Sequence, residues 1–540
     1  MSIDILPDDV LLAIFDFCVD EYPILKAGTE AWHPLVHVCR RWRCIIFGSP
    51  CRLNLRLICT EYTPARDTLD VWPPLPLVIQ NNASLTTKGV DNILAAFERR
   101  DRVYRIELCD VNNSLLEKVL AVMQEPFPEL THLLLKSRGE TDETLPVVSG
   151  SFLGGSAVRL YSLKLDGIPC PGLTKLLPTA THLVDLHLLE IPHFGYISPE
   201  TMATALSTLT SLASLSLGFR SPQSFPDPAN RRPPPLTRHI LPILARFWFK
   251  GACEYLDNLV AHIDAPRVNL FITFFNQILF DTPQLIQFIS RTPTLKAFEK
   301  GHVVFEDRAA EINLSSQTSG YGSLEVRVSC REFDWQVSSL EQVCTLCLPP
   351  LSTLEDLSIY HHTVKHTVLS DPHRQDNIDN TLWLELLHPF TAVKKLYLSK
   401  ELAPRIVPAL RELIEGRTTA VLPTLQNILL EELQPPGPVR HAIWQFVAMR
   451  LAIGHPIAVS PWDRFPVHPA VHSTRQDRSL FINSLTVSDA SMAELSNNPF
   501  IDHIASSLLR FSNINAVSST PTGPFASQYS AEPTLSLPWD

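Results

Sequence analysis

A leucine-rich pattern recurs along this 540-residue chain and restricts the folds that it can adopt. The template Leu-x-x-Leu-x-Leu describes a short strand whose leucines face one side, because side chains alternate along a strand. Its central residues lie 23 to 30 residues apart in the first half of the chain. The first five occurrences are Val103/Ile106/Leu108, Leu130/Leu133/Leu135, Leu160/Leu163/Leu165, Leu183/Leu186/Leu188 and Leu212/Leu215/Leu217. Later occurrences are Leu354/Leu357/Ile359, Val393/Leu396/Leu398, Leu425/Ile428/Leu430 and a weaker match at Ile482/Leu485/Val487.

Helix-like segments separate these strands, for example Asn113 to Met123 and Pro199 to Leu209. A unit of one strand and one helix cannot bury its apolar face alone, so neighbouring units stack. Stacking places the strands in a parallel sheet on the concave side of a solenoid, with the helices outside. The sequence therefore predicts an α/β fold, a leucine-rich-repeat solenoid over residues 101–453.

Several segments depart from the template. Residues 220–239 are rich in proline and locally basic, which predicts an extended surface loop. Residues 256–343 match the template poorly, and we expect divergent, irregular repeats there. Residues 51–100 are expected to link or cap the array. Residues 454–540 are expected to form a C-terminal cap and a disordered tail, because the sequence after Asn515 lacks hydrophobic periodicity.

The first fifty residues have a helical pattern of their own. Pro7 suits the first position of a helix, and Asp8 and Asp9 complement the positive end of its dipole. The apolar residues on one face of this helix are Val10, Leu11, Ile14, Phe15 and Cys18. A second helix is predicted from Pro34 to Gly48. Its apolar side would carry Leu35, Val38, Cys39, Trp42, Ile45 and Ile46.

A module of this size buries too little surface to be very stable alone. The helical pattern alone allows two interpretations of this module. The helices either bind a partner protein or cap the first repeat.

Two parts of this module resemble the F-box family. Leu6 to Phe15 reads Leu-Pro-Asp-Asp-Val-Leu-x-x-Ile-Phe, and Val38 to Trp42 reads Val-Cys-Arg-Arg-Trp. The chain as a whole resembles the F-box/leucine-rich-repeat proteins of mushroom-forming fungi. The resemblance implies an all-α F-box over residues 1–50, ahead of the solenoid. The segment between the two parts, Asp20 to His33, is longer than in compact F-boxes.

The resemblance also implies partners. In the F-box family this domain binds a Skp-type adaptor, which bridges to a cullin scaffold and its RING subunit, and a separate enzyme performs the ubiquitin transfer. An apolar helix face with an aromatic anchor suits such an interface. The implied adaptor contacts are Leu6, Pro7, Val10, Leu11, Ile14, Phe15, Val38, Cys39, Trp42 and Ile46.

The charge and the hydropathy argue against two kinds of partner. A formal charge of -11 and a pI near 5.9 disfavour nucleic acid, because proteins that bind it carry a basic face. The acidic N-terminus does not resemble a signal peptide, and apolar runs such as Asn269 to Phe275 are far shorter than a membrane span. We therefore expect a cytoplasmic or nuclear protein with no membrane partner, whose eleven cysteines stay reduced.

Signals for catalysis, cofactors and metals are weak. Glycine is scarce, and the chain has no Gly-x-Ser-x-Gly elbow, Walker loop or His-Glu-x-x-His. Cys344 and Cys347 have the spacing of a redox or zinc pair, but their segment is apolar and no second pair is nearby, which favours burial. We expect a solvated loop rather than a metal site at His361, His362, His366, Asp371 and His373. No catalytic site, cofactor or metal is predicted.

Three classes of function are compatible with the sequence. The favoured prediction is the substrate-recognition subunit of an SCF-type cullin-RING ubiquitin ligase, in which the solenoid binds a protein substrate. The alternative is a leucine-rich-repeat scaffold or inhibitor with no ubiquitin role, and an enzyme is disfavoured by the missing motifs. The fold does not name the substrate. The concave positions predicted to bind it are His132, Lys164, Asp185, Ser214 and Lys395.

Overall fold

The structure, a computed structural model, describes most of the chain up to Trp462. The described residues are 6–20, 32–50, 52–81, 87–139, 145–222, 237–276, 280–296, 298–316, 322–349, 351–362, 379–416, 421–431, 438–452 and 454–462. Most of the predicted proline-rich loop lies outside them, as does the predicted tail. Also outside them are His366, Asp371, His373, Ile482, Leu485 and Val487.

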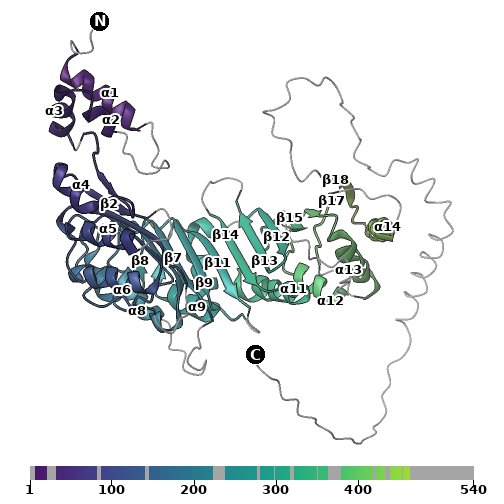
Figure 1. Cartoon of the computed structure of the whole chain (residues 1–540). Helices are drawn as coiled ribbons and strands as arrows, with labels where there is room; N and C mark the ends of the chain where they lie inside the picture. The colour runs from purple at the N-terminus through teal and green to yellow at the C-terminus, as the bar shows by residue number, and fades with distance from the viewer. Residues whose placement is uncertain are drawn as a thin grey trace, which may run out of the picture. The chain divides into compact units, whose positions relative to one another are not determined.

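One sheet of 16 strands runs through the described part of the chain (Figure 1). From one edge to the other its strands are β1 (Leu57–Cys59), β2 (Leu77–Gln80), β3 (Val103–Val111), β4 (His132–Ser137), β5 (Ser162–Asp166), β6 (Asp185–Ile191), β7 (Ser214–Phe219), β9 (Arg246–Gly251), β11 (Asn269–Phe275), β14 (Leu324–Ser329), β13 (Ala309–Ser315), β12 (Lys300–Glu306), β15 (Asp356–His361), β16 (Lys395–Leu398), β17 (Asn427–Leu430) and β18 (Ala458–Pro461). Within this sheet all pairs are parallel except those that β13 makes. A second, small sheet pairs β8 (His239–Ile240) with β10 (Ile263–Asp264).

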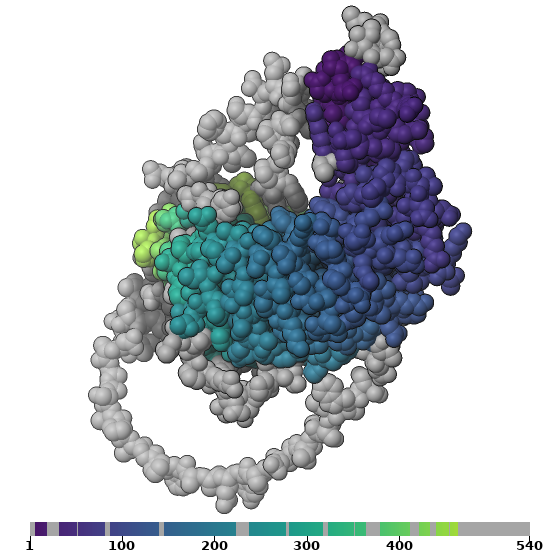
Figure 2. All heavy atoms as spheres, turned by 90° about the vertical axis from the view of Figure 1, so that its left-hand side faces the viewer, coloured from purple at the N-terminus to yellow at the C-terminus, as the bar shows by residue number. Residues whose placement is uncertain are grey.

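The helices line one face of this sheet, as Figure 1 shows for α5, α6, α8, α9, α11 and α12. Their bounds are α4 (Ala65–Val71), α5 (Thr87–Phe97), α6 (Asn113–Val122), α7 (Leu173–Leu176), α8 (Pro199–Leu206), α9 (Cys253–Ala261), α10 (Pro283–Arg291), α11 (Phe333–Gln342), α12 (Asn380–Leu387), α13 (Ala403–Gly416) and α14 (Pro438–Ala452). Short 3-10 turns and one π-helical turn, Val343–Cys347, complete the layer. On the surface the colour changes stepwise from blue to teal (Figure 2), because each repeat lies beside the units before and after it.

The template leucines form the core between the sheet and the helices. Leu133, Leu163, Leu186 and Leu215 are direct neighbours in the parallel register and are almost completely buried. Each central leucine therefore packs on the leucine of the next strand, which is how repeats without a core of their own become stable. The predicted α/β fold of stacked leucine-rich repeats is confirmed.

The central region contains a feature that the template did not predict. Strands β9 and β11 are regular parallel strands; the inward positions of β9 carry Phe247 and Phe249 in place of leucine, and those of β11 carry Leu270 and Ile272. Next, β12 and β13 form an antiparallel hairpin, and β14 returns to pair with β11. The described part of residues 256–343, where divergent repeats were expected, thus contains a hairpin inserted between parallel strands.

The described residues of the N-terminal module form the helices α1 (Asp8–Asp20), α2 (His33–Val36) and α3 (Arg40–Gly48). The prediction of one continuous second helix is wrong, because the chain leaves the helical conformation at Cys39. There the backbone is extended, and the Cys39 Sγ accepts a hydrogen bond from the Trp42 amide at 3.4 Å, which caps the start of α3.

Residues 51–100 were expected to link or cap the array, and their described part belongs to the same sheet. They supply β1 and β2, together with α4 and α5. The N-terminal helices contact this first part: the Trp32 indole donates a hydrogen bond to the carbonyl oxygen of Arg56 at 3.1 Å, and the rings of Trp32 and Trp72 lie 5.3 Å apart. Among the described residues no helix combines the length and the apolar character that crossing a bilayer requires.

Candidate protein-interaction surfaces

Helix α1 has two apolar sides. Leu11 and Phe15 are fully buried in the module, where the Phe15 ring lies against Trp42 with 4.8 Å between ring centroids. Three other apolar residues are exposed, namely Val10 (39%), Ile14 (39%) and Phe17 (63%). Because successive members are four and three residues apart, they share one helix face and form a strip, called the α1 stripe below.

An ion pair ties the start of α1 to α3. Nη2 of Arg41 lies 2.6 Å from Oδ1 of Asp8 and also donates a hydrogen bond to the carbonyl oxygen of Leu6 at 2.6 Å. Val38 lies just before α3 and is 57% exposed. The Arg41–Asp8 ion pair therefore places the exposed Val38, just before α3, at the end of the module where α1 begins.

The residues that the F-box resemblance implied as adaptor contacts differ in how far the structure exposes their side chains. Those that are exposed are Pro7, Val10, Ile14 and Val38, and those that are partly buried are Leu6, Cys39 and Trp42. Leu11, Phe15 and Ile46 are completely buried in the module's own core. Their side chains pack the module in this structure, so the implied contact is corrected for these three. Phe17 was missed because it lies beyond the family pattern, although its place seven residues after Val10 identifies it.

The second surface is the face of the sheet opposite to the helices, called the open face below. The third and fifth positions of the Leu-x-x-Leu-x-Leu template project onto it, because the leucines project to the other side. The register aligns third positions into a first row, which contains His132, Ser162, Asp185, Ser214 and Arg246. The fifth positions form a second row, which contains Leu134, Lys164, His187, Ser216 and Trp248.

Four of the five predicted substrate-binding residues lie together in these two rows. They are His132, Lys164, Asp185 and Ser214. Lys395 does not join them. It begins β16, towards the other end of the sheet, where its Nζ lies 3.6 Å from Oδ1 of Asp356.

Ser214 is buried, with only 4% of its surface exposed. Larger side chains of the two neighbouring strands cover β7: the Trp248 ring lies so close to Gly218 that a Cβ there would come within 2.8 Å of it. Nearby, Nζ of Lys250 on β9 lies 2.5 Å from Oε1 of Glu190 on β6, on the other side of β7. Ser214 is therefore buried beneath the surface of the open face, and its prediction as a substrate contact is corrected.

His187 lies near the centre of the second row. Its Nδ1 is 2.8 Å from the hydroxyl oxygen of Ser216. Burial lowers the pKa of His187, and the nearby cations Lys164 and Arg246 lower it further, against the opposite effect of Asp185. The imidazole is therefore neutral at pH 7, in a neighbourhood where cations outnumber carboxylates. The sequence analysis did not name three other residues of the open face as substrate contacts, although their template positions place them there. They are His187, Arg246 and Trp248.

A short row of rings runs along the start of three strands. The ring of His132 lies between Tyr104 and Tyr161, with centroid distances of 6.0 and 5.6 Å. The guanidinium of Arg56 lies 4.2 Å from the centroid of the Tyr104 ring, a cation-π contact. Burial lowers the pKa of His132, with further lowering by Arg105 and Arg56. This imidazole, too, is neutral and close to cations.

Towards β12, β13 and β14 the open face is acidic. Arg327 forms ion pairs with Glu306 and with Glu311, the latter at 3.3 Å. Burial raises the pKa of Glu311, and the neighbouring carboxylate of Glu325 raises it further. Burial likewise raises the pKa of Glu325. Three carboxylates around one guanidinium leave an excess of negative charge here, opposite in sign to the region around His187.

Comparisons with known proteins give no family. No family model and no curated protein matches the chain. One solved structure that resembles it is the leucine-rich repeat-containing protein LegL7 from Legionella pneumophila, with 12% identity, 73% of this chain and 97% of that chain covered, and a TM-score of 0.25. Another is the complex of Rad7 and Elc1 in yeast, with 12% identity, 80% and 91% covered, and a TM-score of 0.22. These values are low, and the leucine-rich-repeat fold rests on the strand register itself.

The cysteine pair singled out in the sequence is buried, as expected. Cys344 and Cys347 lie on the π-helical turn and are both unpaired thiols. Burial raises the pKa of both thiols, that of Cys347 to about 12. A protonated, inaccessible thiol is neither a nucleophile nor a metal ligand. No group of three or more His, Cys, Asp or Glu among the described residues is arranged to hold a metal ion.

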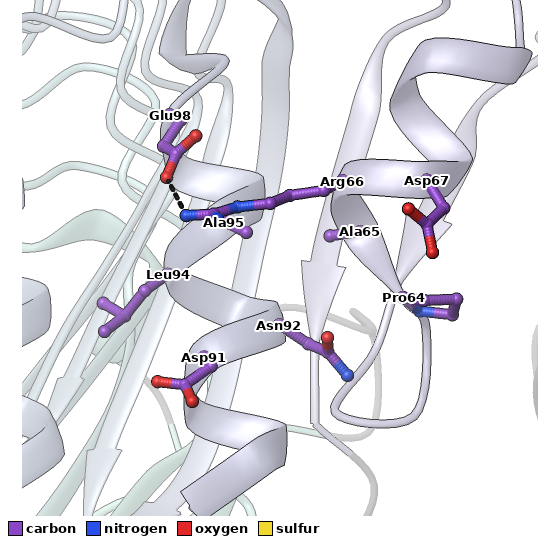
Figure 3. Close-up of a pocket in the computed structure, with 9 residues that line it drawn as sticks. All are labelled: Pro64, Ala65, Arg66, Asp67, Asp91, Asn92, Leu94, Ala95 and Glu98. Atoms are coloured by element: carbon purple, nitrogen blue, oxygen red, sulfur yellow. Dashed lines mark hydrogen bonds and ion pairs between the residues drawn. The ribbon is translucent and has the colours of Figure 1, made fainter.

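A hollow of about 580 Å³ lies between α4 and α5 (Figure 3). Arg66 of α4 spans it, with Nη2 3.0 Å from Oε1 of Glu98, the residue directly after α5. The amide of Asn92 donates a hydrogen bond to the carbonyl oxygen of Glu61 at 2.9 Å. The lining contains no histidine, cysteine, serine or lysine, and its three carboxylates, Asp67, Asp91 and Glu98, are exposed to solvent.

Proposed function

We propose that the chain is the substrate-recognition subunit of an SCF-type cullin-RING ubiquitin ligase. In this proposal the N-terminal module is an F-box that binds a Skp-type adaptor, and through it a cullin scaffold, while the open face holds the protein substrate. The observation that carries the proposal is the α1 stripe. It is an apolar strip that the module leaves exposed although its core is already filled by Leu11 and Phe15.

The α1 stripe has the form of a helix that lies in a partner's groove. Such interfaces read apolar anchors spaced by three, four and seven residues, which is the spacing of Val10, Ile14 and Phe17. Burying one such side chain contributes roughly 1.5–3 kcal/mol. Because Val10 and Ile14 are 39% exposed and Phe17 is 63% exposed, each anchor contributes part of this amount, and the contacts around the α1 stripe add the remainder that association requires.

The proposal gives the chain no catalytic step of its own. A receptor that holds a substrate beside a conjugating enzyme accelerates the transfer by proximity, which needs a binding face and no reactive side chain. We accordingly propose that the chain is not an enzyme, binds no cofactor, and acts in the cytoplasm or nucleus, where its thiols stay reduced.

Adaptor binding by matched variants tests this proposal. The change Ile14→Glu with Phe17→Glu places two charges on the α1 stripe, and we expect it to weaken binding of a fungal Skp-type adaptor by about 2 kcal/mol or more. Isothermal titration calorimetry on the full chain measures the loss. The control is Tyr62→Glu with Val71→Glu, two exposed apolar residues beside and on α4 that lie outside the α1 stripe. Equal binding by wild type and stripe variant, or no binding by either, would refute the proposal.

One observation favours a second candidate, a scaffold or inhibitor whose N-terminal helices only cap the repeats. Trp32 contacts both Arg56 and Trp72, so the module packs on the first part of the sheet as a cap does. A cap predicts that removal of residues 1–50 lowers the melting temperature of the solenoid and that no adaptor co-purifies. An F-box predicts adaptor binding by the full chain whatever the effect of the deletion on melting.

A further inference from the structure

We propose that the open face over β5, β6, β7 and β9 binds an extended, acidic segment of a partner protein. This inference deepens the proposed function, since it names the chemistry of the substrate that the open face would hold. It rests on the role of that face in binding and does not depend on the adaptor.

Two cations on this part of the sheet lack a carboxylate partner among the described residues. Lys164 on β5 and Arg246 on β9 are both exposed and make no ion pair there. By contrast, Lys136 and Lys250 on the same face are paired with Asp166 and Glu190. Lys164 and Arg246 can therefore attract a negatively charged partner, because their charges are not neutralised by a carboxylate of the described chain.

The remaining residues of the two rows offer little opposing charge. From β4 to β9 the two rows contain ten residues, and Asp185 is the one carboxylate among them. His132 and His187 supply neutral imidazoles that can donate a hydrogen bond or take up a proton. The local surplus is positive in a chain whose formal charge is -11, so this region differs in sign from the protein as a whole.

The spacing of the cations favours a distributed anion. Lys164 and Arg246 are separated by three strand steps of about 4.8 Å and lie in adjacent rows, so their Cα atoms are roughly 15 Å apart. An extended chain advances about 3.3 Å per residue, which places matching carboxylates four or five residues apart. A run of glutamate or aspartate crossing the strands fits this spacing, whereas one phosphoryl group presents its charge at a single point.

Apolar side chains border the same region and would fix the position of the segment. Trp248 and Phe271 are partners in the register of β9 and β11, and both are partly exposed on the open face. An apolar residue of the bound segment packs there. Beyond Phe271 comes Glu325, its partner on β14, with Glu311 and Glu306 further on. Those carboxylates repel an acidic segment and limit it to the region from β5 to β11.

A peptide-binding measurement on the full chain tests the inference. The probe is a short fluorescein-labelled peptide that repeats Glu-Glu-Leu-Glu, and its isosteric control repeats Gln-Gln-Leu-Gln. We expect the glutamate peptide to bind with an affinity that falls as salt is added, and the glutamine peptide to bind at least about tenfold more weakly. Equal binding of the two peptides would overturn the inference.

Charge-reversal variants locate the site. Lys164→Glu with Arg246→Glu is expected to weaken binding of the glutamate peptide at least about tenfold. The control, Lys118→Glu with Lys175→Glu, makes the same change in net charge at exposed positions of α6 and α7. We expect it to change binding by less than about twofold, because the screening length at physiological salt is short. An equal loss in both variants would mean that only the net charge matters and would overturn the proposal.

Two further binding measurements distinguish an acidic segment from other anionic ligands. A Gly/Ser peptide with one phosphoserine and a single-stranded oligonucleotide are both expected to bind more weakly than the glutamate peptide, and tighter binding of either would contradict an acidic segment as the ligand. Adaptor binding is measured on the same Lys164/Arg246 variant. Retained adaptor binding with lost peptide binding supports this inference, whereas peptide binding without adaptor binding by the wild type refutes the ligase proposal alone.

Discussion

Neighbouring residues of α1 have opposite roles, because a helix turns by about 100° per residue. Leu11 packs the core of the module, and Val10 beside it faces outward. We expect Leu11→Ala to lower the free energy of unfolding by about 2–5 kcal/mol, as for other buried leucines. Val10→Ala should change it by less than about 0.5 kcal/mol, since the side chain is exposed. Hydrogen exchange of α1, α2 and α3 measures both, and similar losses would contradict the division of the helix into two sides.

His187 gives the proposed peptide site a pH dependence. The groups that face it are Lys164 from β5, Asp185 from its own strand, Ser216 from β7 and Arg246 from β9. Burial and the two cations hold the pKa of His187 below its ordinary value, so the free protein carries a neutral ring at pH 7. A bound acidic segment opposes the cations and raises this pKa, so binding takes up a proton.

It follows that the glutamate peptide should bind more tightly at pH 6 than at pH 8, by a factor of about 2–5. Fluorescence anisotropy across this range measures the change. His187→Gln keeps a polar side chain that cannot take up the proton, and we expect its pH dependence to be flatter. A steeper dependence in the variant, or tighter binding at high pH in the wild type, would contradict the assignment of His187.

At the scale of the element, one helix is held by a carboxylate of its neighbour. Oδ1 of Asp257 on α9 accepts hydrogen bonds from the amides of Gln284 and Leu285, at 2.8 and 2.9 Å, at the start of α10. The first amides of a helix have no partner within it, so this side chain caps α10 from the preceding repeat. The stacking of these two repeats is thus partly polar.

We expect Asp257→Ala to lower the free energy of unfolding by about 1–3 kcal/mol, because it leaves the buried amide of Leu285 and the partly buried amide of Gln284 without this acceptor. Urea unfolding followed by circular dichroism measures the effect. The matched control is Asp379→Ala, which removes a carboxylate that accepts from Thr381 N at 3.0 Å at an exposed helix start. Water can replace that bond, so the control should lose less, and a larger loss there would contradict the argument.

Much of the element order was predictable from the sequence. The eight strong template matches correspond to β3 to β7 and β15 to β17, because leucines at fixed spacing mark an inward face wherever the chain forms a repeat. β9 was missed because Phe247 and Phe249 stand where the template has leucine, and β11 was missed because Arg267 stands three residues before its central Leu270. The hairpin of β12 and β13 depends on tertiary pairing that no local pattern encodes.

The interaction surfaces were only partly predictable for a similar reason. Helical spacing identifies an apolar residue without saying whether it faces the core or a partner, so the buried Phe15 and the exposed Ile14 look alike in the sequence. On the sheet, template positions place Lys164 on the open face correctly. They do not show that Trp248 covers Gly218 and that Ser214 is buried, because burial there depends on side-chain sizes in adjacent strands.

At the scale of the whole molecule, β13 joins two blocks of parallel repeats. The sheet order runs from β11 through β14, β13 and β12 to β15, so the strand pairing between the two blocks passes through β13. The helical layer adds a bridge, since α10 packs against the π-helical turn Val343–Cys347 and the Cys347 thiol donates a hydrogen bond to the carbonyl oxygen of Phe280 at 3.8 Å. Repeat arrays derive their cooperativity from such contacts between neighbours, so a weak joint uncouples the two sides.

Substitutions that weaken β13 should therefore split the unfolding of the chain into two transitions. Ile312 and Leu314 on β13 are fully buried, and replacing both with alanine removes core contacts worth about 2–5 kcal/mol each. We expect this variant to unfold in two separate urea transitions, with hydrogen exchange rising first in β12, β13 and β14. The control replaces Leu133 and Leu163, equally buried in the parallel block, and should lower stability there without uncoupling β15 to β18 from β12. If the β13 variant keeps a single transition while the control divides, the joint lies elsewhere, and the two blocks are held together by the helical layer rather than by the sheet.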